Sequence, residues 1–299
     1  MALTFAELQD ELGRVLSTGV RSGDSIRTSF GRWINMACKR IAYAYPWDSM
    51  RAEQRVATVA PYSTGTATFT NGSTTVAGTS TVWSSAFVGR KVALGVGQPY
   101  YRIATRVSNT EITIAEAYAE ATATDTTYTA FQDEYNLAAT THAIEDAAIF
   151  DGTWSGPLHD YEQRQFDHSD FAGWSTGPPV AYCVATSTTV GTPRVRLSPV
   201  PDDVYRTSWK YLKTWTDLTG SESYATQGLP EDVEELILDR ALRWAPRVEG
   251  SRQVMSESAW NNALAKVWAA YSKRRYRFGV RSGFSTSRFP TIVFNSGGL

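Results

Sequence analysis

The densest group of residues that could perform chemistry lies between positions 159 and 170. It combines imidazole and carboxylate side chains: His159, Asp160, Asp167, His168 and Asp170. Both types bind divalent metals, so this pattern is compatible with a metal-dependent hydrolase. Metal ligands are usually spaced more tightly and joined by a cysteine or a third histidine. The plainer interpretation, a solvated surface loop, is therefore favoured.

The common catalytic motifs are absent from the sequence. It contains no Walker A pattern, no strand-linked GxGxxG, no GxSxG and no HExxH. Its two cysteines, Cys38 and Cys183, lie in apolar stretches and form neither a zinc motif nor a disulfide framework, which is typical of a reducing compartment. We therefore expect a protein without enzymatic activity, metal or cofactor.

A second candidate site is a run of basic residues at the end of the last predicted helix. It comprises Lys273, Arg274, Arg275 and Arg277, with Arg281 following. Basic side chains stabilise the C-terminal end of a helix, but one or two charges are enough for that. The remaining charges are candidates for contact with DNA phosphates or with an acidic protein.

The third candidate is an apolar, β-prone segment in the tail, at 289–294. Its residues are Phe289, Pro290, Thr291, Ile292, Val293 and Phe294. Such a segment is an unprotected strand edge in a monomer. Two interpretations remain open: the segment packs back on its own subunit, or it adds as a strand to another chain.

Composition limits the possible function classes. The chain has 299 residues, with 29 basic and 30 acidic residues, which argues against a dedicated nucleic-acid binder. Ten Trp and fifteen Tyr in a chain with only 20% charged residues favour an oligomer. The sequence has no signal-peptide pattern and no apolar run of membrane-spanning length, so we expect no membrane association.

Helical patterns occur at both ends of the chain, at 4–17, 25–45, 230–245 and 252–277. Thr4 and Glu7 form a capping box at the first helix. The third helix begins at Pro230 and ends with Arg240, Arg243 and Arg247, which complement the helix dipole. The apolar stripe of the last helix consists of Trp260, Leu264, Val267, Trp268 and Tyr271.

The middle of the chain has β character. Residues 63–130 are rich in Thr, Ser, Gly and Val, and Asn71-Gly72 is a strong hairpin signal. Further strands are predicted at 90–95, 99–107, 111–115, 126–132, 144–150 and 180–186. Two more, at 193–200 and 204–213, are predicted to pair across the turn at Pro201-Asp202-Asp203.

These patterns together predict an α+β fold. We expect an antiparallel helical bundle of two N-terminal and two C-terminal helices with a small β-sheet, built from residues 1–62 and 134–275. Residues 63–133 would form an inserted β-sandwich or barrel, and residues 276–299 an extended C-terminal arm.

The helix endings and the strand order carry a family resemblance. Near the N-terminus the relevant residues are Trp33, Ile34, Asn35, Ala37, Tyr43, Tyr45, Pro46 and Trp47. In the second half they are Tyr182, Arg196, Leu197, Pro199, Val200, Pro201, Tyr205, Trp209, Tyr211, Leu229, Pro230 and Glu231. With these features the chain resembles the head–tail adaptor (connector, or head-completion) proteins of tailed bacteriophages. Residues 67–133 look like the small β-domain inserted in many such proteins.

The resemblance implies a structural virion protein. Such proteins form a ring, typically of twelve copies, between the portal protein and a tail, tail-terminator or nozzle protein, around the channel for genomic DNA. It implies a location at the neck of the virion after synthesis in the bacterial cytoplasm, and an arm whose residues 289–294 reach the portal. It implies no catalytic residues. The alternatives are a capsid- or tail-binding module built on the β-domain and, less favoured, the metal-dependent hydrolase.

Overall fold

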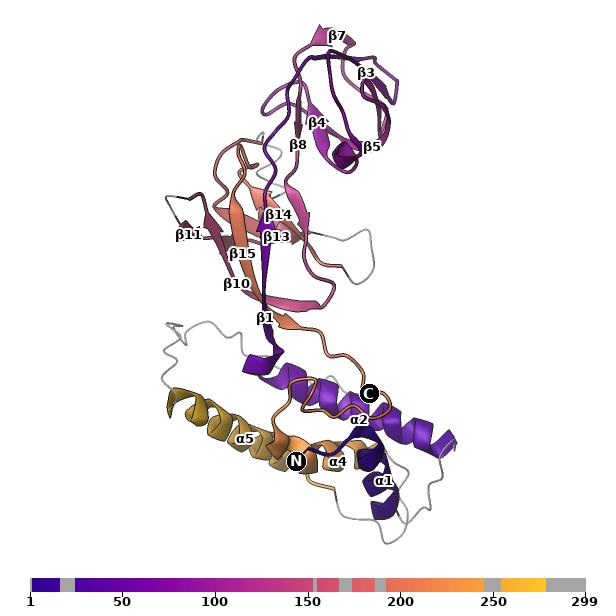
Figure 1. The fold of residues 1–299 in the computed structure, drawn as a ribbon, viewed down its shortest axis with the longest axis vertical. Helices are drawn as coiled ribbons and strands as arrows, with labels where there is room; N and C mark the ends of the chain where they lie inside the picture. Colours follow the sequence, from indigo (N-terminus) through magenta and orange to yellow (C-terminus); the bar gives the residue numbers. More distant parts are fainter. Residues whose placement is uncertain are drawn as a thin grey trace. The chain divides into compact units, whose positions relative to one another are not determined.

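The computed structural model describes residues 2–16, 25–152, 155–166, 174–185, 192–244 and 254–277 (Figure 1). They form a mixed α+β chain with N-terminal helices, three largely antiparallel sheets and C-terminal helices, which confirms the expected fold class. The chain divides into two compact units. We call Met1–Trp47 with Trp215–Leu299 the helical unit and Asp48–Thr214 the β unit. The limits of an inserted domain at 63 and 133 stay a prediction.

The first helix, α1 (Phe5–Val15), begins at the predicted capping box. The Glu7 amide donates to the Thr4 hydroxyl at 3.3 Å, and the Thr4 amide donates to the Glu7 carboxylate at 2.7 Å. Leu8 and Leu12 are fully buried on one face. The local sequence therefore determines both where α1 starts and which face it buries.

The second helix, α2 (Ser25–Ala44), ends just before Pro46, as predicted. Arg27 of this helix donates to Asp10 of α1 at 2.7 Å, which ties the two helices together. The buried stripe of α2 consists of Phe30, Ile34, Ala37, Cys38 and Ile41.

The C-terminal helices of the helical unit are α4 (Glu234–Leu242) and α5 (Glu257–Arg277). A short 3-10 turn, η3 (Glu231–Val233), follows Pro230 and leads into α4. The buried residues of this stretch include Val233, Leu236, Ile237, Leu238 and Ala241. Helix α4 packs against α2 and α1.

Two four-stranded sheets of the β unit share one hydrophobic core. The first has the order β1 (Arg51–Ala57), β15 (Arg206–Lys213), β10 (Thr141–Phe150) and β11 (Ser155–Pro157). The second has the order β12 (His159–Asp160), β13 (Ala181–Ala185), β14 (Arg194–Ser198) and β9 (Glu134–Asn136). Trp209 of the first sheet packs edge-on against Tyr182 of the second, with ring centroids 5.0 Å apart.

The expected pairing of residues 193–200 with 204–213 is wrong. Both segments contain strands, but β14 pairs with β13 and β9, whereas β15 pairs with β1 and β10. The connection contains Pro199 and Pro201, which lack an amide hydrogen and cannot continue a tight hairpin ladder. The Tyr205 amide instead donates to the Thr58 hydroxyl at 2.7 Å, which brings the chain to the end of β1.

The third sheet has seven strands and curls into a half-barrel (Figure 1). Its order is β7 (Ala123–Thr126), β2 (Thr66–Phe69), β3 (Thr75–Thr79), β6 (Glu111–Ile114), β5 (Tyr100–Ser108), β4 (Lys91–Ala93) and β8 (Thr129–Phe131). The predicted hairpin joins β2 to β3, and Gly72 there has a φ of 75°, which favours glycine. The expected strand at 126–132 is divided, since β7 ends at Thr126 and β8 starts at Thr129.

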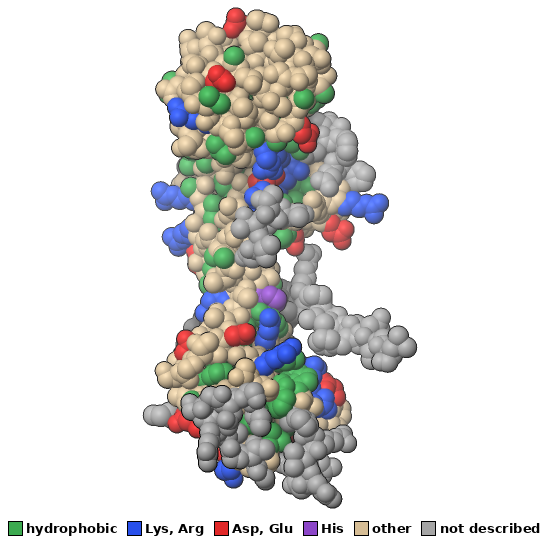
Figure 2. All heavy atoms as spheres, turned by 90° about the vertical axis from the view of Figure 1, so that its right-hand side faces the viewer, with side chains coloured by type: hydrophobic (Ala, Val, Ile, Leu, Met, Phe, Trp, Pro, Cys, Tyr) green, Lys and Arg blue, Asp and Glu red, His purple; other side chains and the backbone are tan. Residues whose placement is uncertain are grey.

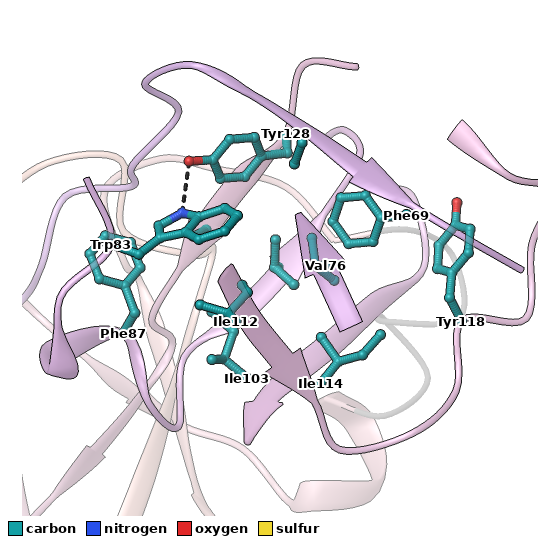
Figure 3. Packing of buried hydrophobic residues seen from close by; sticks show 12 residues of the cluster. Phe69, Val76, Trp83, Phe87, Ile103, Ile112, Ile114, Tyr118 and Tyr128 are labelled. Atoms are coloured by element: carbon teal, nitrogen blue, oxygen red, sulfur yellow. Dashed lines mark hydrogen bonds between the residues drawn. The ribbon is translucent and has the colours of Figure 1, made fainter. Parts of the chain in front are cut away.

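The half-barrel encloses its own aromatic and aliphatic core (Figure 3). The indole of Trp83 is fully buried and donates to the Tyr128 hydroxyl at 2.9 Å. Phe69, Val76 and Ile112 lie in the same cluster. The Trp83 indole therefore buries a large apolar surface, and its N–H still has a hydrogen-bond acceptor.

Candidate functional site

Two of the five residues of the predicted metal site lie in the part of the chain that the structure describes. His159 and Asp160 form β12, an edge strand, and both are exposed. Asp167, His168 and Asp170 lie outside the described residues. In the described ranges, no three His, Cys, Asp or Glu side chains come close enough to hold a metal ion. The described residues therefore give the hydrolase interpretation no support.

The predicted basic site lies in the last turns of α5, which continues to Arg277. The Lys273 side chain is exposed. The side chains of Arg274, Arg275 and Arg277 lie outside the described residues, and so do Phe289, Pro290, Thr291, Ile292, Val293 and Phe294 of the tail. Their roles stay predictions.

A charged group that the sequence analysis did not identify lies at the start of α5. Arg40 of α2 and Arg243, just after α4, both donate to the carboxylate of Glu257. Arg240 of α4 donates to the same carboxylate, with its Nη1 at 2.7 Å from Oε2. We call Arg40, Arg240, Arg243 and Glu257 the arginine cluster. It joins α2, α4 and α5 at one point of the helical unit.

The arginine cluster carries more positive than negative charge, because one carboxylate faces three guanidinium groups. Burial lowers the pKa of Arg40, and the like charges of Arg240 and Arg243 lower it further. Burial alone would raise the pKa of Glu257, but the Arg240 hydrogen bond and the surrounding positive charges hold it below its usual value. Glu257 is therefore ionised at neutral pH, where arginine side chains in proteins are charged as a rule.

The cluster combines one fixed arginine with two that reach solvent. The Arg240 side chain is only 6% exposed, and its guanidinium carbon lies 5.4 Å from the Trp244 ring centroid and 5.1 Å from that of Trp260. The Arg40 and Arg243 side chains are 38% and 28% exposed. Exposed guanidinium groups supported by a rigid base are suited to binding carboxylates or phosphates.

The opposite charge is concentrated elsewhere in the helical unit. Seven acidic residues and no basic residue lie between positions 217 and 239: Asp217, Glu222, Glu231, Asp232, Glu234, Glu235 and Asp239. Five of them, all except Glu234 and Asp239, are exposed, and we call residues 217–235 the acidic segment. By contrast, α2 has four basic residues and no acidic one, and α5 has five basic residues and one acidic residue. Charge is thus separated by sign between residues 217–239 and the helices α2 and α5.

An aromatic group lies beside the second half of α5. Tyr45 stacks on Trp268 with ring centroids 5.3 Å apart, and Trp268 stacks on Tyr271 at 5.9 Å. Trp47 is fully buried beneath them, whereas the other three rings are only half-buried. The sequence analysis expected the last helix to bury Trp268 and Tyr271 as core, and the structure leaves them partly open. Figure 2 shows hydrophobic side chains reaching the surface of the helical unit.

The β unit also contains a dense charged group, and there the charges are paired. Lys91 and Arg196 each donate to the Asp133 carboxylate at 2.7 Å, and Asp133 is 2% exposed. Arg102 and Arg194 each donate to the neighbouring Glu134 at 2.8 Å. These contacts tie β4 and β5 of the half-barrel to β9 and β14.

Comparison of the sequence with protein-family models and with the curated proteins gave no relative. No protein-family model matches the chain, and a search of the curated proteins found no match. None of the helices in the described part of the chain has the length and apolar character needed to cross a bilayer. The resemblance to head–tail adaptors therefore stays a prediction from the sequence.

Proposed function

We propose that the chain is a structural virion protein, a head–tail adaptor. Copies of it would form a ring that joins the portal to the tail and surrounds the DNA channel. The proposal is supported by the sequence resemblance and by the half-buried, charge-separated surface of the helical unit. In this role the protein has no catalytic site and no cofactor.

The observation that carries the proposal is the incomplete burial of α5. Of its described side chains, only Trp260 and Leu264 are buried, and both lie in its first half. The exposed positions include the alanines Ala259, Ala265, Ala269 and Ala270. A helix belonging to a self-contained domain normally buries an apolar stripe along its length. A neighbouring copy in a ring would cover the second half of α5, where the aromatic rings lie.

The finer architecture belongs to the same proposal. The helices would form an antiparallel bundle of two N-terminal and two C-terminal helices, and the half-barrel would act as an inserted β-domain on the ring. Lys273, Arg274, Arg275 and Arg277 would contact DNA phosphates or an acidic partner. Residues 276–299 would extend as an arm whose segment Phe289–Phe294 adds to the portal as a strand.

Measuring the mass of the purified full-length protein tests the ring. Light scattering coupled to size-exclusion chromatography, native mass spectrometry and negative-stain images should show a closed ring, with twelve copies expected. A single subunit at tens of micromolar, with no ring in tailless heads, would overturn the proposal.

Truncation tests the arm separately. A chain lacking residues 279–299 should still form rings but should no longer co-purify with the portal protein. Normal portal binding by the truncated chain would reject the arm assignment and leave the ring unaffected.

The runner-up function is a capsid- or tail-binding module, and one observation favours it. The half-barrel surface is largely uncharged in Figure 2 and carries exposed hydroxyl side chains such as Thr75, Thr79 and Thr105. Charged residues are depleted in the core of protein interfaces, so a charge-poor sheet face is suited to contact with another protein. Full-length Thr79→Lys/Thr105→Lys should then lose binding to capsids or tails while retaining its ring. Unchanged binding would reject this function.

A further inference from the structure

We propose that the arginine cluster binds the acidic segment of a second copy of this chain. The contact would be heterologous: a basic surface on one subunit would face an acidic surface on the next. It rests on the proposed ring, because it needs self-association, and it names the two surfaces that make it.

The first argument is the unbalanced charge of the arginine cluster. Glu257 is its one carboxylate, and it already accepts hydrogen bonds from three arginines. The Arg40 and Arg243 side chains remain partly exposed. Further carboxylates at this surface would reduce the repulsion between these like charges.

The second argument is that the matching charge lies in the same helical unit. Asp232 and Glu235 are exposed at the start of α4, and no basic residue lies between positions 217 and 239. The whole chain has a net charge of −1. A second copy therefore brings about as many acidic residues as basic ones. A nucleic acid would pair with the basic surface and be repelled by the acidic segment, so the charge pattern favours a second copy over DNA.

The third argument is the position of the two surfaces on α4. Glu235 lies in the first turn of α4, and Arg243 lies just after its last turn. With a rise of about 1.5 Å per residue, the two positions are roughly 12 Å apart along the helix. Two different surfaces at opposite ends of one element make a heterologous contact, which closes into a ring when the rotation allows it.

Paired charge reversals in the full-length protein test the contact. Arg40→Glu/Arg243→Glu makes both surfaces acidic, and Asp232→Lys/Glu235→Lys makes both basic. Each variant alone should associate roughly tenfold or more weakly than the native chain. A one-to-one mixture should assemble again with the two variants alternating, which native mass spectrometry detects if one variant is isotope-labelled. The chain carrying all four changes should self-associate.

Control variants keep the test independent of folding. Arg55 is 83% exposed on β1, so Arg55→Glu changes a charge in the β unit and should leave association unchanged. If Arg40→Glu/Arg243→Glu loses its helical circular dichroism, the milder Arg40→Gln/Arg243→Gln should still weaken association and reduce its dependence on salt.

The outcomes separate this inference from the proposed function. If the native chain forms rings and both reversed variants form them equally well, or if the mixture does not assemble, the contact is wrong and the ring stands. If Arg40→Glu/Arg243→Glu instead loses binding to duplex DNA with association intact, the cluster is a nucleic-acid site and the inference fails. If the native chain does not self-associate at all, the proposed function fails with it.

Discussion

The two units of this protein use charge in opposite ways. In the β unit, Asp133 and Glu134 are buried or nearly so, and each accepts hydrogen bonds from two basic side chains. In the helical unit, three arginines share one carboxylate, while the acidic segment lies in another part of the chain. Charges paired within a subunit fix its own fold, whereas exposed charges separated by sign can attract a partner.

The largest expected effect compares two tryptophans. Trp209 is 1% exposed in the shared core of the four-stranded sheets, whereas Trp268 is half-buried on α5. Trp209→Ala should lower the free energy of unfolding by about 3–5 kcal/mol, because it leaves a large cavity. Trp268→Ala should cost about 1–2 kcal/mol and weaken self-association more than Trp209→Ala does.

Urea unfolding and sedimentation velocity measure the two effects on the same samples. Equal losses of stability from both substitutions would mean that α5 is covered within one subunit. The contrast between the units would then disappear.

The next effect concerns the paired charges of the β unit. Asp133→Asn removes the carboxylate that faces the buried Lys91 and the partly buried Arg196, which is a severe defect. We expect the free energy of unfolding to fall by about 3 kcal/mol. This is toward the low end for the loss of one partner of a buried ion pair, because Glu134 still lies 3.6 Å from the Lys91 Nζ.

Asp146→Asn is the matched control. Its partner Lys210 is 3.4 Å away and both side chains are more than a third exposed, so the cost should be below about 0.5 kcal/mol. Thermal unfolding monitored by tryptophan fluorescence compares the two variants. A cost at Asp133 as small as that at Asp146 would show that the buried network contributes little.

A smaller effect should appear in acid. Burial alone would raise the pKa of Glu134, but hydrogen bonds from Arg102 and Arg194 and the charge of Lys91 lower it from 4.5 to about 2. A carboxyl whose pKa is lower in the folded state stabilises the fold above its unfolded pKa, and this contribution is lost as the pH falls through the folded value. The stabilisation is therefore present above about pH 4.5 and declines between about 4.5 and 2.

Allowing for the exposure of Arg102, we expect Glu134 to account for about 2 kcal/mol of the loss. Urea titrations at pH 5.5 and pH 3 should show a larger drop for the native chain than for Glu134→Gln. Parallel pH dependence in the two proteins would contradict this account.

The smallest effect is local to α1. Thr4→Ala removes the hydroxyl that accepts the Glu7 amide and should cost about 1 kcal/mol. Thr4→Ser keeps that acceptor and should behave like the native chain. Helical circular dichroism during urea unfolding measures both, and equal costs for the two variants would assign the loss to the Thr4 methyl group.

The sequence predicted the parts of the fold that neighbouring residues determine. Thr4 and Glu7 are three positions apart, and their side chains alone define the start of α1. Asn71-Gly72 likewise defines the hairpin between β2 and β3, because its geometry depends on Gly72 itself. Such features can be predicted because their partners lie within one turn of chain.

Features that depend on distant partners were not predicted. Period-2 alternation marked β14 and β15 as strands, yet it carries no information about which strand lies beside each. The arginine cluster joins Arg40 to Glu257 across 217 positions, and in sequence its members look like ordinary helix-end charges. One feature of the sequence could have indicated the cluster: α2 and α5 are strongly basic, which becomes visible when charged residues are counted separately for each helix.

The buried thiols have a practical consequence for studying the assembly. Cys38 and Cys183 are the chain's two cysteines; both are buried, neither forms a disulfide, and burial raises the pKa of the Cys38 thiol. Thiolates are the species that react with maleimides, so neither native side chain should take up label in the folded protein. One cysteine introduced on exposed α5, such as Ser258→Cys, would then carry a fluorophore alone and report subunit exchange directly.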